Sequence, residues 1–197
     1  MGSLPSKSLS KLVSNLALEV GARTFVETGT YRGDTAAWAA EHFTIVHSIE
    51  ICQRYIDLSA NRLRSFDHVQ VHKGDTRTLM REIVALLTGP TVFWLDAHSG
   101  GGFFGDKDDC PLLHELAAIS AASVQTYVFI DDARGFTAPP PPPYDFRAWP
   151  DLKAVLDAGY AGRDRFSFLH EDVIAILPPE STNFAREELF RIRPKLS

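Results

Sequence analysis

The stretch that decides the fold is Glu27-Thr28-Gly29-Thr30-Tyr31-Arg32-Gly33, which follows the short apolar run Thr24–Val26. Gly29 allows a tight turn after a strand, and Gly33 lets the next helix begin close to a ligand. The spacing E-x-G-x-x-x-G differs from the G-x-G-x-x-G pattern that cradles a pyrophosphate. The carboxylate of Glu27 at the strand end suits a cationic ligand better than a phosphate. Glycine-rich turns are common, so the interpretation depends on the rest of the chain.

Short apolar runs alternate with amphipathic stretches on both sides of this motif. The predicted strands are Thr24–Val26, Ile45–Ile49, Val69–His72, Thr91–Leu95 and Thr126–Ile130. The predicted helices are Lys7–Val20, Thr35–His42, Arg54–Arg64, Thr76–Leu87 and Pro111–Ala122. Strands that read as continuous apolar runs are typical of a parallel sheet buried on both faces. The alternation therefore predicts a parallel sheet with helices on both sides.

The end of the chain departs from this alternation. After a helical stretch at Asp151–Ala158, two further strands at Phe166–His170 and Val173–Leu177 are separated by only two residues. Such spacing is typical of an antiparallel hairpin. We therefore expect an α/β, Rossmann-like fold with a mostly parallel seven-stranded sheet and a C-terminal antiparallel hairpin. The expected domain is 21–180, preceded by an N-terminal helical extension (1–20) and followed by a C-terminal tail (181–197).

Acidic residues follow the second and third predicted strands. Glu50 lies about 20 positions after the glycine turn, where a carboxylate can accept hydrogen bonds from both hydroxyls of a ribose. The third strand ends in Gly74-Asp75-Thr76, where Asp75 can reach an adenine amino group. Asp75 or Thr76 can equally cap the next helix, and the two roles are compatible. These strand ends predict a nucleoside-binding edge.

The fourth and fifth strands are followed by Asp96-Ala97-His98 and by Asp131-Asp132. Three carboxylates at one edge repel one another unless a cation or a proton intervenes, and Mg²⁺ prefers such oxygen ligands. Alternatively, Asp96 holds an amino group and Asp132 caps a turn. His98 is the best candidate for a general base, because its pKa lies near neutral pH. It can also be a metal ligand or a packed strand-end residue.

With these residues the chain resembles the class I S-adenosylmethionine (SAM)-dependent methyltransferases, over roughly residues 20–178. The resemblance implies SAM as the cofactor, with Glu27 and the 28–33 loop near its methionine moiety, Glu50 on the ribose and Asp75 on the adenine. The cofactor-binding residues expected on this basis are Glu27, Thr28, Gly29, Tyr31, Gly33, Glu50, Ile51, Gly74, Asp75, Thr76 and Asp96. Ile51 and His72 are expected to line the adenine pocket.

The second set of strand ends is similar to the metal-dependent macrocin O-methyltransferase type. This resemblance implies that Asp96, Asp131 and Asp132 bind Mg²⁺, which would hold the substrate hydroxyls and lower their pKa. His98 and Asp96 would be the catalytic residues. The sequence departs from that subgroup after the fourth strand, where Asp-Ala-His is followed by Ser99-Gly100-Gly101-Gly102.

Composition narrows the classes of partner. The chain has 197 residues, a net charge of −5 and two cysteines, Cys52 and Cys110, and it has no basic stretch and no apolar run long enough to span a bilayer. We expect a cytoplasmic protein with a small-molecule methyl acceptor and no nucleic-acid or membrane partner. So short a chain leaves little room for a separate substrate domain, so a homo-oligomer is one way to complete the site.

Two long segments flank the predicted site. Ser99–Asp109, rich in glycine, reads either as a lid or as a solvated loop. Arg134–Trp149 contains aromatic residues that can form a substrate wall or pack against the proline tract 139–143. The predicted function is methyl transfer from SAM to a hydroxyl or amine of a small molecule, assisted by Mg²⁺. The alternatives are a non-catalytic SAM-binding module and an NAD-dependent oxidoreductase, although the latter lacks its glycine fingerprint.

Overall fold

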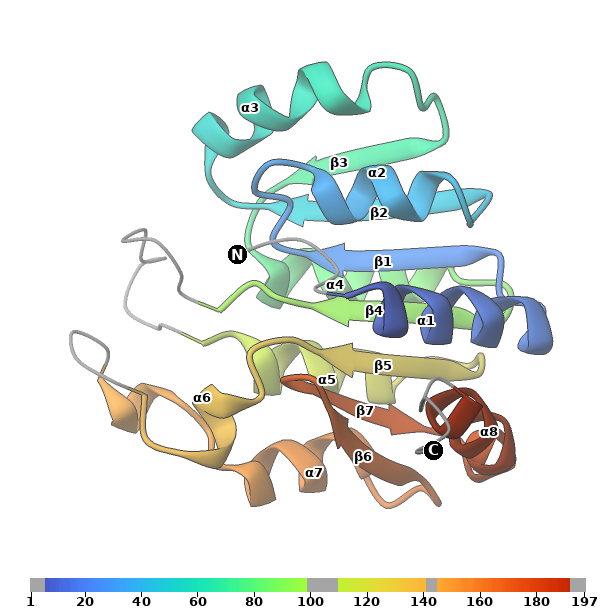
Figure 1. The fold of residues 1–197 in the computed structure, drawn as a ribbon. Helices are drawn as coiled ribbons and strands as arrows, with labels where there is room; N and C mark the ends of the chain where they lie inside the picture. The colour runs from blue at the N-terminus through green and yellow to red at the C-terminus, as the bar shows by residue number, and fades with distance from the viewer. Residues whose placement is uncertain (1–5, 99–109, 141–144, 192–197) are drawn as a thin grey trace, which may run out of the picture.

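The computed structural model describes residues 6–98, 110–140 and 145–191 and confirms the predicted α/β fold (Figure 1). Its seven strands form one sheet in the order β3-β2-β1-β4-β5-β7-β6. The strands are β1 Thr24–Thr28, β2 Ile45–Glu50, β3 Val69–Lys73, β4 Thr91–Leu95, β5 Thr126–Ile130, β6 Phe166–His170 and β7 Val173–Leu177. The first five run parallel, and β7 pairs antiparallel with both β5 and β6.

Helices cover both faces of this sheet. They are α1 Lys7–Val20, α2 Asp34–Ala40, α3 Gln53–Leu63, α4 Thr76–Leu86, α5 Leu112–Ser120, α6 Arg134–Thr137, α7 Leu152–Tyr160 and α8 Thr182–Arg191, with short 3-10 turns η1 Phe146–Ala148 and η2 Pro179–Ser181. One apolar core lies between the sheet and α4, α5 and α7. A second lies between the opposite face and α1, α2 and α8. The strands β4 and β5 are buried along their whole length, as their unbroken apolar runs predicted.

The predicted hairpin has the bounds that the sequence indicated. Glu171 and Asp172 form its two-residue turn, and both have positive φ angles, 50° and 72°. A turn with two left-handed residues matches the twist of the strands that it joins. The main-chain carbonyl of Asp172 accepts a hydrogen bond of 2.8 Å from the N–H of Ala133, so the turn is fixed to the segment that follows β5.

The C-terminal segment, expected as a tail, contains a helix that the sequence analysis missed. Helix α8 contacts α1, and the amide of Asn15 donates a hydrogen bond of 3.0 Å to the carboxylate of Glu188. Ala185 lies in the second core. Helices α1 and α8 therefore both belong to the helical layer on this face of the sheet.

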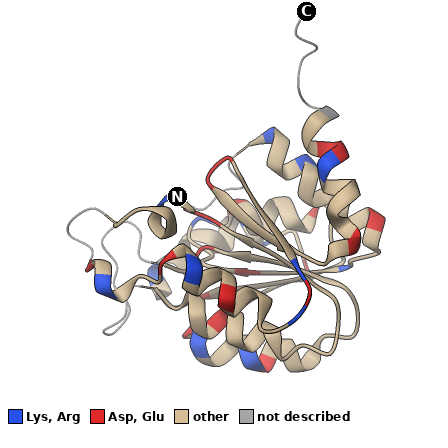
Figure 2. Cartoon of the chain, turned by 90° about the horizontal axis from the view of Figure 1, so that it is seen from below, with Lys and Arg blue, Asp and Glu red and all other residues tan. Residues whose placement is uncertain are grey.

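Charged side chains of both signs are interspersed along the helices (Figure 2). None of the helices within the described ranges combines the length and the apolar character needed to cross a bilayer.

The turn after β1 passes unusually close to the end of β4. Gly29 has φ +88°, and a β-carbon at this position would lie 2.5 Å from the main-chain oxygen of Asp96. A side chain therefore meets both a conformational and a steric penalty here. Gly33 is also left-handed, at φ +75°, and a β-carbon there would meet Ser59 and Leu63 of α3 at 3.0 and 3.2 Å. Gly33 thus allows α2 to begin against α3.

We expect Gly29→Ala to lower the free energy of unfolding by about 2 kcal/mol or more, from left-handed strain and displacement of the β4 end. Gly89→Ala is the matched control, because its added methyl group would meet no atom within 4 Å. Urea denaturation of the two variants measures the difference. Equal stabilities would contradict the tight approach at Gly29.

Candidate functional site

The predicted site residues gather at the carboxyl ends of the parallel strands. Strands β1 and β4 are neighbours in the sheet, although β2 and β3 separate them in the chain. The chain thus leaves β1 toward one side of the sheet and leaves β4 toward the other, which creates the position where open α/β sheets bind ligands. The N–H of Asp96 donates to the carbonyl of Thr28 at 3.1 Å and to its hydroxyl at 3.2 Å, so the two strand ends are joined.

Glu27 is a buried acid at this position, and its residue is only 1% exposed. Its carboxylate accepts a hydrogen bond of 2.5 Å from the hydroxyl of Ser48, which also lies 2.5 Å from the hydroxyl of Thr30. Burial, followed by repulsion from Asp96 and Glu50, raises the pKa of Glu27 to about 8 in spite of the Ser48 bond. The site therefore favours either a proton on Glu27 or a cation beside it.

Glu50 is held at the end of β2 by two main-chain donors. The N–H of Tyr31 donates to Oε2 at 3.0 Å, and the N–H of Cys52 donates to Oε1 at 2.8 Å. Tyr31 adopts a left-handed φ of 46°, and its ring packs edge-on against Tyr55 at 4.9 Å between centroids. Each carboxylate oxygen can accept a further hydrogen bond. Glu50 thus fixes the glycine turn and can still bind a hydroxyl.

Asp75 caps α4, one of the two roles expected for it. Its Oδ1 accepts the N–H of Arg77 at 2.9 Å, while its Oδ2 lies 3.6 Å from the guanidinium of the same residue. Gly74, beside it, donates its N–H to the carbonyl of Glu50 at 3.0 Å, and Thr76 is the first residue of the helix and is buried. Because the helix cap uses Oδ1, Oδ2 remains available, and its contact with an adenine amino group stays a prediction.

The two expected adenine-pocket residues differ in their surroundings. Ile51 is 41% exposed beside Glu50. The Nε2 atom of His72 lies 3.0 Å from Nδ1 of His47 on the neighbouring strand. Burial lowers the pKa of both histidines, and for His47 the neighbouring His72 adds to the effect. His72 is therefore committed to a pair within the sheet.

The ends of β4 and β5 bring Asp96, His98 and Asp132 together. One ligand atom from each residue lies within 4.8 Å of the other two. The Nε2 atom of His98 is 3.4 Å from Oδ2 of Asp132 and 3.8 Å from Oδ1 of Asp96. The imidazole interaction, opposed by burial, lowers the pKa of Asp132 to about 2. For His98, burial lowers the pKa, but Asp132, Asp96 and Glu115 outweigh it and raise the pKa overall.

Asp131, which the sequence analysis placed in a metal site with Asp96 and Asp132, is not one of these three residues, and its part in a metal site stays a prediction. Its Oδ1 accepts the N–H of Asp132 at 2.8 Å, and Asp132 then turns away with a left-handed φ of 54°. Burial and repulsion from Asp96 raise the pKa of Asp131 to about 6. The observed trio thus differs from the expected one by the exchange of Asp131 for His98.

The segment after β5 surrounds His98. The rings of Phe136 and Trp149 meet the imidazole edge-on, with centroids 5.5 and 5.2 Å away. Arg134 donates to Oδ1 of Asp132 at 2.5 Å and forms a second ion pair with Asp172. These aromatic rings therefore pack against the imidazole, and the substrate wall expected from the sequence stays a prediction. Tyr144, most of the proline tract and the predicted lid 99–109 lie outside the described residues.

Glu115 of α5 is a further buried acid, which the sequence analysis did not include among the site residues. It is 1% exposed, and burial raises its pKa to about 7, against the opposing effects of Thr76, His98 and Thr28. Its Oε1 has no hydrogen-bond partner among the described residues. Glu115 is the fourth residue of α5 and has mainly apolar neighbours in that helix. This pattern could have indicated from the sequence that the carboxyl group is buried.

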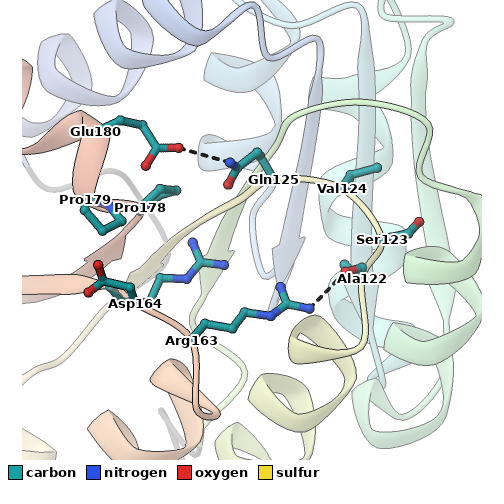
Figure 3. Close-up of a pocket in the computed structure, with 10 residues that line it drawn as sticks. Ala122, Ser123, Val124, Gln125, Arg163, Asp164, Pro178, Pro179 and Glu180 are labelled. Atoms are coloured by element: carbon teal, nitrogen blue, oxygen red, sulfur yellow. Dashed lines mark hydrogen bonds between the residues drawn. The ribbon is translucent and has the colours of Figure 1, made fainter.

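A separate pocket of about 470 Å³ lies at the opposite edge of the sheet, where β5 begins (Figure 3). Residues 122–125, 163–165 and 178–180 line it. Arg163 donates to the carbonyls of Ser120 and Ala122, and Arg165 donates to the carbonyl of Thr126 at 2.7 Å. These guanidinium groups bind main-chain carbonyls at the start of β5, whereas the carboxylates of the candidate site lie at the carboxyl ends of the strands.

The strand order and the antiparallel C-terminal hairpin define a Rossmann-like α/β fold, which is also the fold of solved methyltransferase structures. No protein-family model and no curated protein matches the sequence. The O-methyltransferase TomG from Streptomyces achromogenes, solved with SAM, has a TM-score of 0.57 and 18% identity over 88% of this chain and 81% of its own. The O-methyltransferase from Bacillus cereus, solved with S-adenosylhomocysteine (SAH), has a TM-score of 0.58 and 16% identity over 88% and 84%. The SAH-bound methyltransferase PaMTH1 from Podospora anserina has a TM-score of 0.58 and 19% identity over 87% and 79%. At these identities the likeness establishes the fold.

The raised pKa of Glu27 predicts a pH-dependent stability of the ligand-free protein. Because the folded state holds the proton up to about pH 8 and the unfolded chain releases it near 4.5, stability falls as pH rises between these values. In the wild-type protein this titration lowers the free energy of unfolding by an amount on the order of 3 kcal/mol between pH 5 and pH 8, and we expect this decrease to be absent in Glu27→Gln. Urea denaturation across this range measures it. Parallel curves for both proteins would contradict a protonated Glu27.

Proposed function

We propose that this protein is a SAM-dependent methyltransferase that acts on a hydroxyl group of a small molecule. The observation that carries the proposal is the set of acids at three successive strand ends, Glu27, Glu50 and Asp75, around a glycine turn without a pyrophosphate cradle. A nucleoside ligand that carries positive charge and no phosphate matches this arrangement. SAM has both properties.

The buried acids favour the cationic part of SAM near Glu27. An acid with a pKa of about 8 in a desolvated position gains stabilisation from a neighbouring positive charge. The sulfonium and ammonium groups of SAM would supply that charge, with Asp96 on the adjacent strand end. Glu50 would bind the ribose hydroxyls and Asp75 the adenine amino group.

The acceptor would bind beside the Asp96, His98 and Asp132 group, under the wall of Phe136 and Trp149. Methyl transfer needs the acceptor oxygen aligned with the sulfonium methyl group and its proton removed. In the protein without a bound ion, His98 and the carboxylates around it are the candidate groups for removing that proton. An oxygen nucleophile suits this cluster because a hydroxyl must lose its proton to react, and the cluster is rich in negative charge.

The two alternative functions, an NAD-dependent oxidoreductase and a non-catalytic SAM-binding module, would require other features at the carboxyl ends of the strands. An NAD-dependent oxidoreductase requires a pyrophosphate site, whereas the turn after β1 presents the buried acid Glu27. A non-catalytic SAM-binding module would use the nucleoside edge and leave the cluster around His98 without a role. Incubation with SAM and pooled small metabolites, followed by detection of SAH, separates the module from the enzyme.

We expect Asp75→Asn to weaken SAM and SAH binding by about tenfold, since the amide retains the helix cap but turns a donor toward the adenine amino group. Asp151→Asn is the matched control, because Asp151 caps α7 in the same way through a hydrogen bond of 2.8 Å to Ala154. Isothermal titration calorimetry of the variants measures the effect. Absence of SAM and SAH binding to the wild-type protein would overturn the proposal.

Proton release on binding tests the place of the sulfonium. SAM carries the sulfonium charge and SAH does not, so SAM should lower the pKa of Glu27 more than SAH does. We therefore expect more protons released with SAM than with SAH at neutral pH, and no difference in Glu27→Gln. Calorimetry in buffers with different ionisation enthalpies counts the protons. An equal count for both ligands in the wild-type protein would place the sulfonium away from Glu27.

A further inference from the structure

We infer that Asp96, His98 and Asp132 form a binding site for a divalent transition-metal ion such as Zn²⁺, Co²⁺ or Fe²⁺, in preference to Mg²⁺. The inference concerns these three side chains and does not depend on methyl transfer. It differs from the Mg²⁺ site expected from the sequence in both its ligands and its metal, because Asp131 is replaced by a histidine nitrogen.

The spacing of the three donors suits one ion. Ligand atoms at about 2.1 Å from a metal lie roughly 3.0–3.5 Å from one another in tetrahedral or octahedral geometry. The Nε2 atom of His98 lies 3.4 Å from the nearer oxygen of Asp132 and 3.8 Å from that of Asp96. These two separations are within a few tenths of an ångström of that range, and the ligand atoms of Asp96 and Asp132 lie within 4.8 Å of each other, so movement of the two carboxylates alone would bring all three donors to one ion.

The buried imidazole nitrogen of His98 is a second observation that points to a cation. The side chain of His98 is 2% exposed, and its Nε2 has no hydrogen-bond partner among the described residues. Buried polar atoms normally have a partner, and an atom without one in a native structure calls for an ion or another group. This nitrogen points toward two carboxylates, which is the place for a cation.

The kind of donor determines the kind of metal. Imidazole nitrogen binds borderline metals such as Zn²⁺ and Fe²⁺ well, whereas Mg²⁺ prefers a site made of oxygen. With Asp131 in place of His98 the donors would all be oxygen, but Asp131 is bound to the N–H of Asp132 and lies outside the group. One nitrogen and two carboxylates therefore favour a transition metal.

The surroundings of the trio have the character of a metal site. The second carboxylate oxygen of Asp132 is held by Arg134, which is held in turn by Asp172. Phe136 and Trp149 pack against the imidazole and restrict its rotation. Groups that orient ligands in this way raise metal affinity, and their loss typically costs 10–100-fold.

The test is a Co²⁺ titration of the untagged, full-length, metal-free protein, followed by visible absorption. We expect one Co²⁺ bound per chain, displaced by an equimolar amount of Zn²⁺ and retained in a roughly hundredfold excess of Mg²⁺. X-ray absorption of the Zn²⁺-loaded protein should show the scattering of one imidazole. A spectrum with oxygen ligands alone, or displacement of Co²⁺ by Mg²⁺, would overturn the inference.

Three substitutions identify the ligands. His98→Gln and Asp132→Asn should each weaken Co²⁺ binding by about a hundredfold or more. Asp131→Asn removes the same charge as Asp132→Asn and keeps the acceptor for the Asp132 N–H, so it should weaken binding by less than about tenfold. Equal losses in Asp131→Asn and Asp132→Asn, or unchanged binding in His98→Gln, would contradict the assignment.

Thermal unfolding of each variant shows whether it is folded. If His98→Gln does not fold, the comparison of Asp131→Asn with Asp132→Asn still tests the assignment.

SAH titration of the same preparations distinguishes this inference from the proposed function. If the protein bound SAH but not Co²⁺, only the metal-site inference would be contradicted. If the protein bound Co²⁺ but not SAH, the metal-site inference would stand and the proposed methyltransferase function would be contradicted.

Discussion

The burial of negative charge at one edge of the sheet is the constraint on which the rest of the structure depends. Parallel strands end together, so acids placed at successive strand ends meet in a region with little water. Desolvation is the main reason that the pKa values of Glu27, Glu115 and Asp131 are raised. A carboxyl group in this position must hold a proton, accept several hydrogen bonds or lie beside a cation.

The protein satisfies some of these acids with its own groups. The carboxylate of Glu50 accepts two main-chain N–H groups, and that of Asp75 accepts the N–H of Arg77 in the first turn of α4. Asp132 has a guanidinium on one side and an imidazole on the other. Among the described residues, the carboxylate of Glu27 accepts a hydrogen bond from the hydroxyl of Ser48, and Nε2 of His98 has no hydrogen-bond partner. Glu27 lies on β1, next to β4 in the sheet, and His98 follows the end of β4, so the proposed cationic cofactor and the proposed metal ion would occupy neighbouring positions.

The sequence predicted the order and type of the elements because local patterns determine them. The hairpin bounds and Lys7–Val20 agreed with the structure, since a two-residue turn and a regular apolar stripe are local signals. The strand β1 extends beyond the predicted Val26 to Thr28, because Glu27 is polar in sequence but buried in the sheet. Helix α8 was missed, since its charged residues obscured the few apolar positions that pack against α1.

The candidate site could be predicted only to the level of strand ends. Adjacent residues on an extended strand point to opposite sides, but Asp131 and Asp132 lie where the strand has ended and the backbone turns left-handed. Which of them faces His98 therefore depends on that turn, and the turn depends on the hydrogen bond from Ala133 to the β6–β7 hairpin. The hairpin is about 40 residues further along the chain, so no local pattern around Asp131 contains this information.

The same long-range contact gives the antiparallel hairpin a part in the site. Asp172 in its turn binds both the main chain and the guanidinium of Arg134, and Arg134 holds one oxygen of Asp132. The other oxygen is thereby directed to the imidazole of His98. An edge hairpin that only extended the sheet would need no such contacts. Because these contacts orient the carboxylate of Asp132 at the β5 end, the hairpin both completes the sheet and positions a side chain of the proposed metal site.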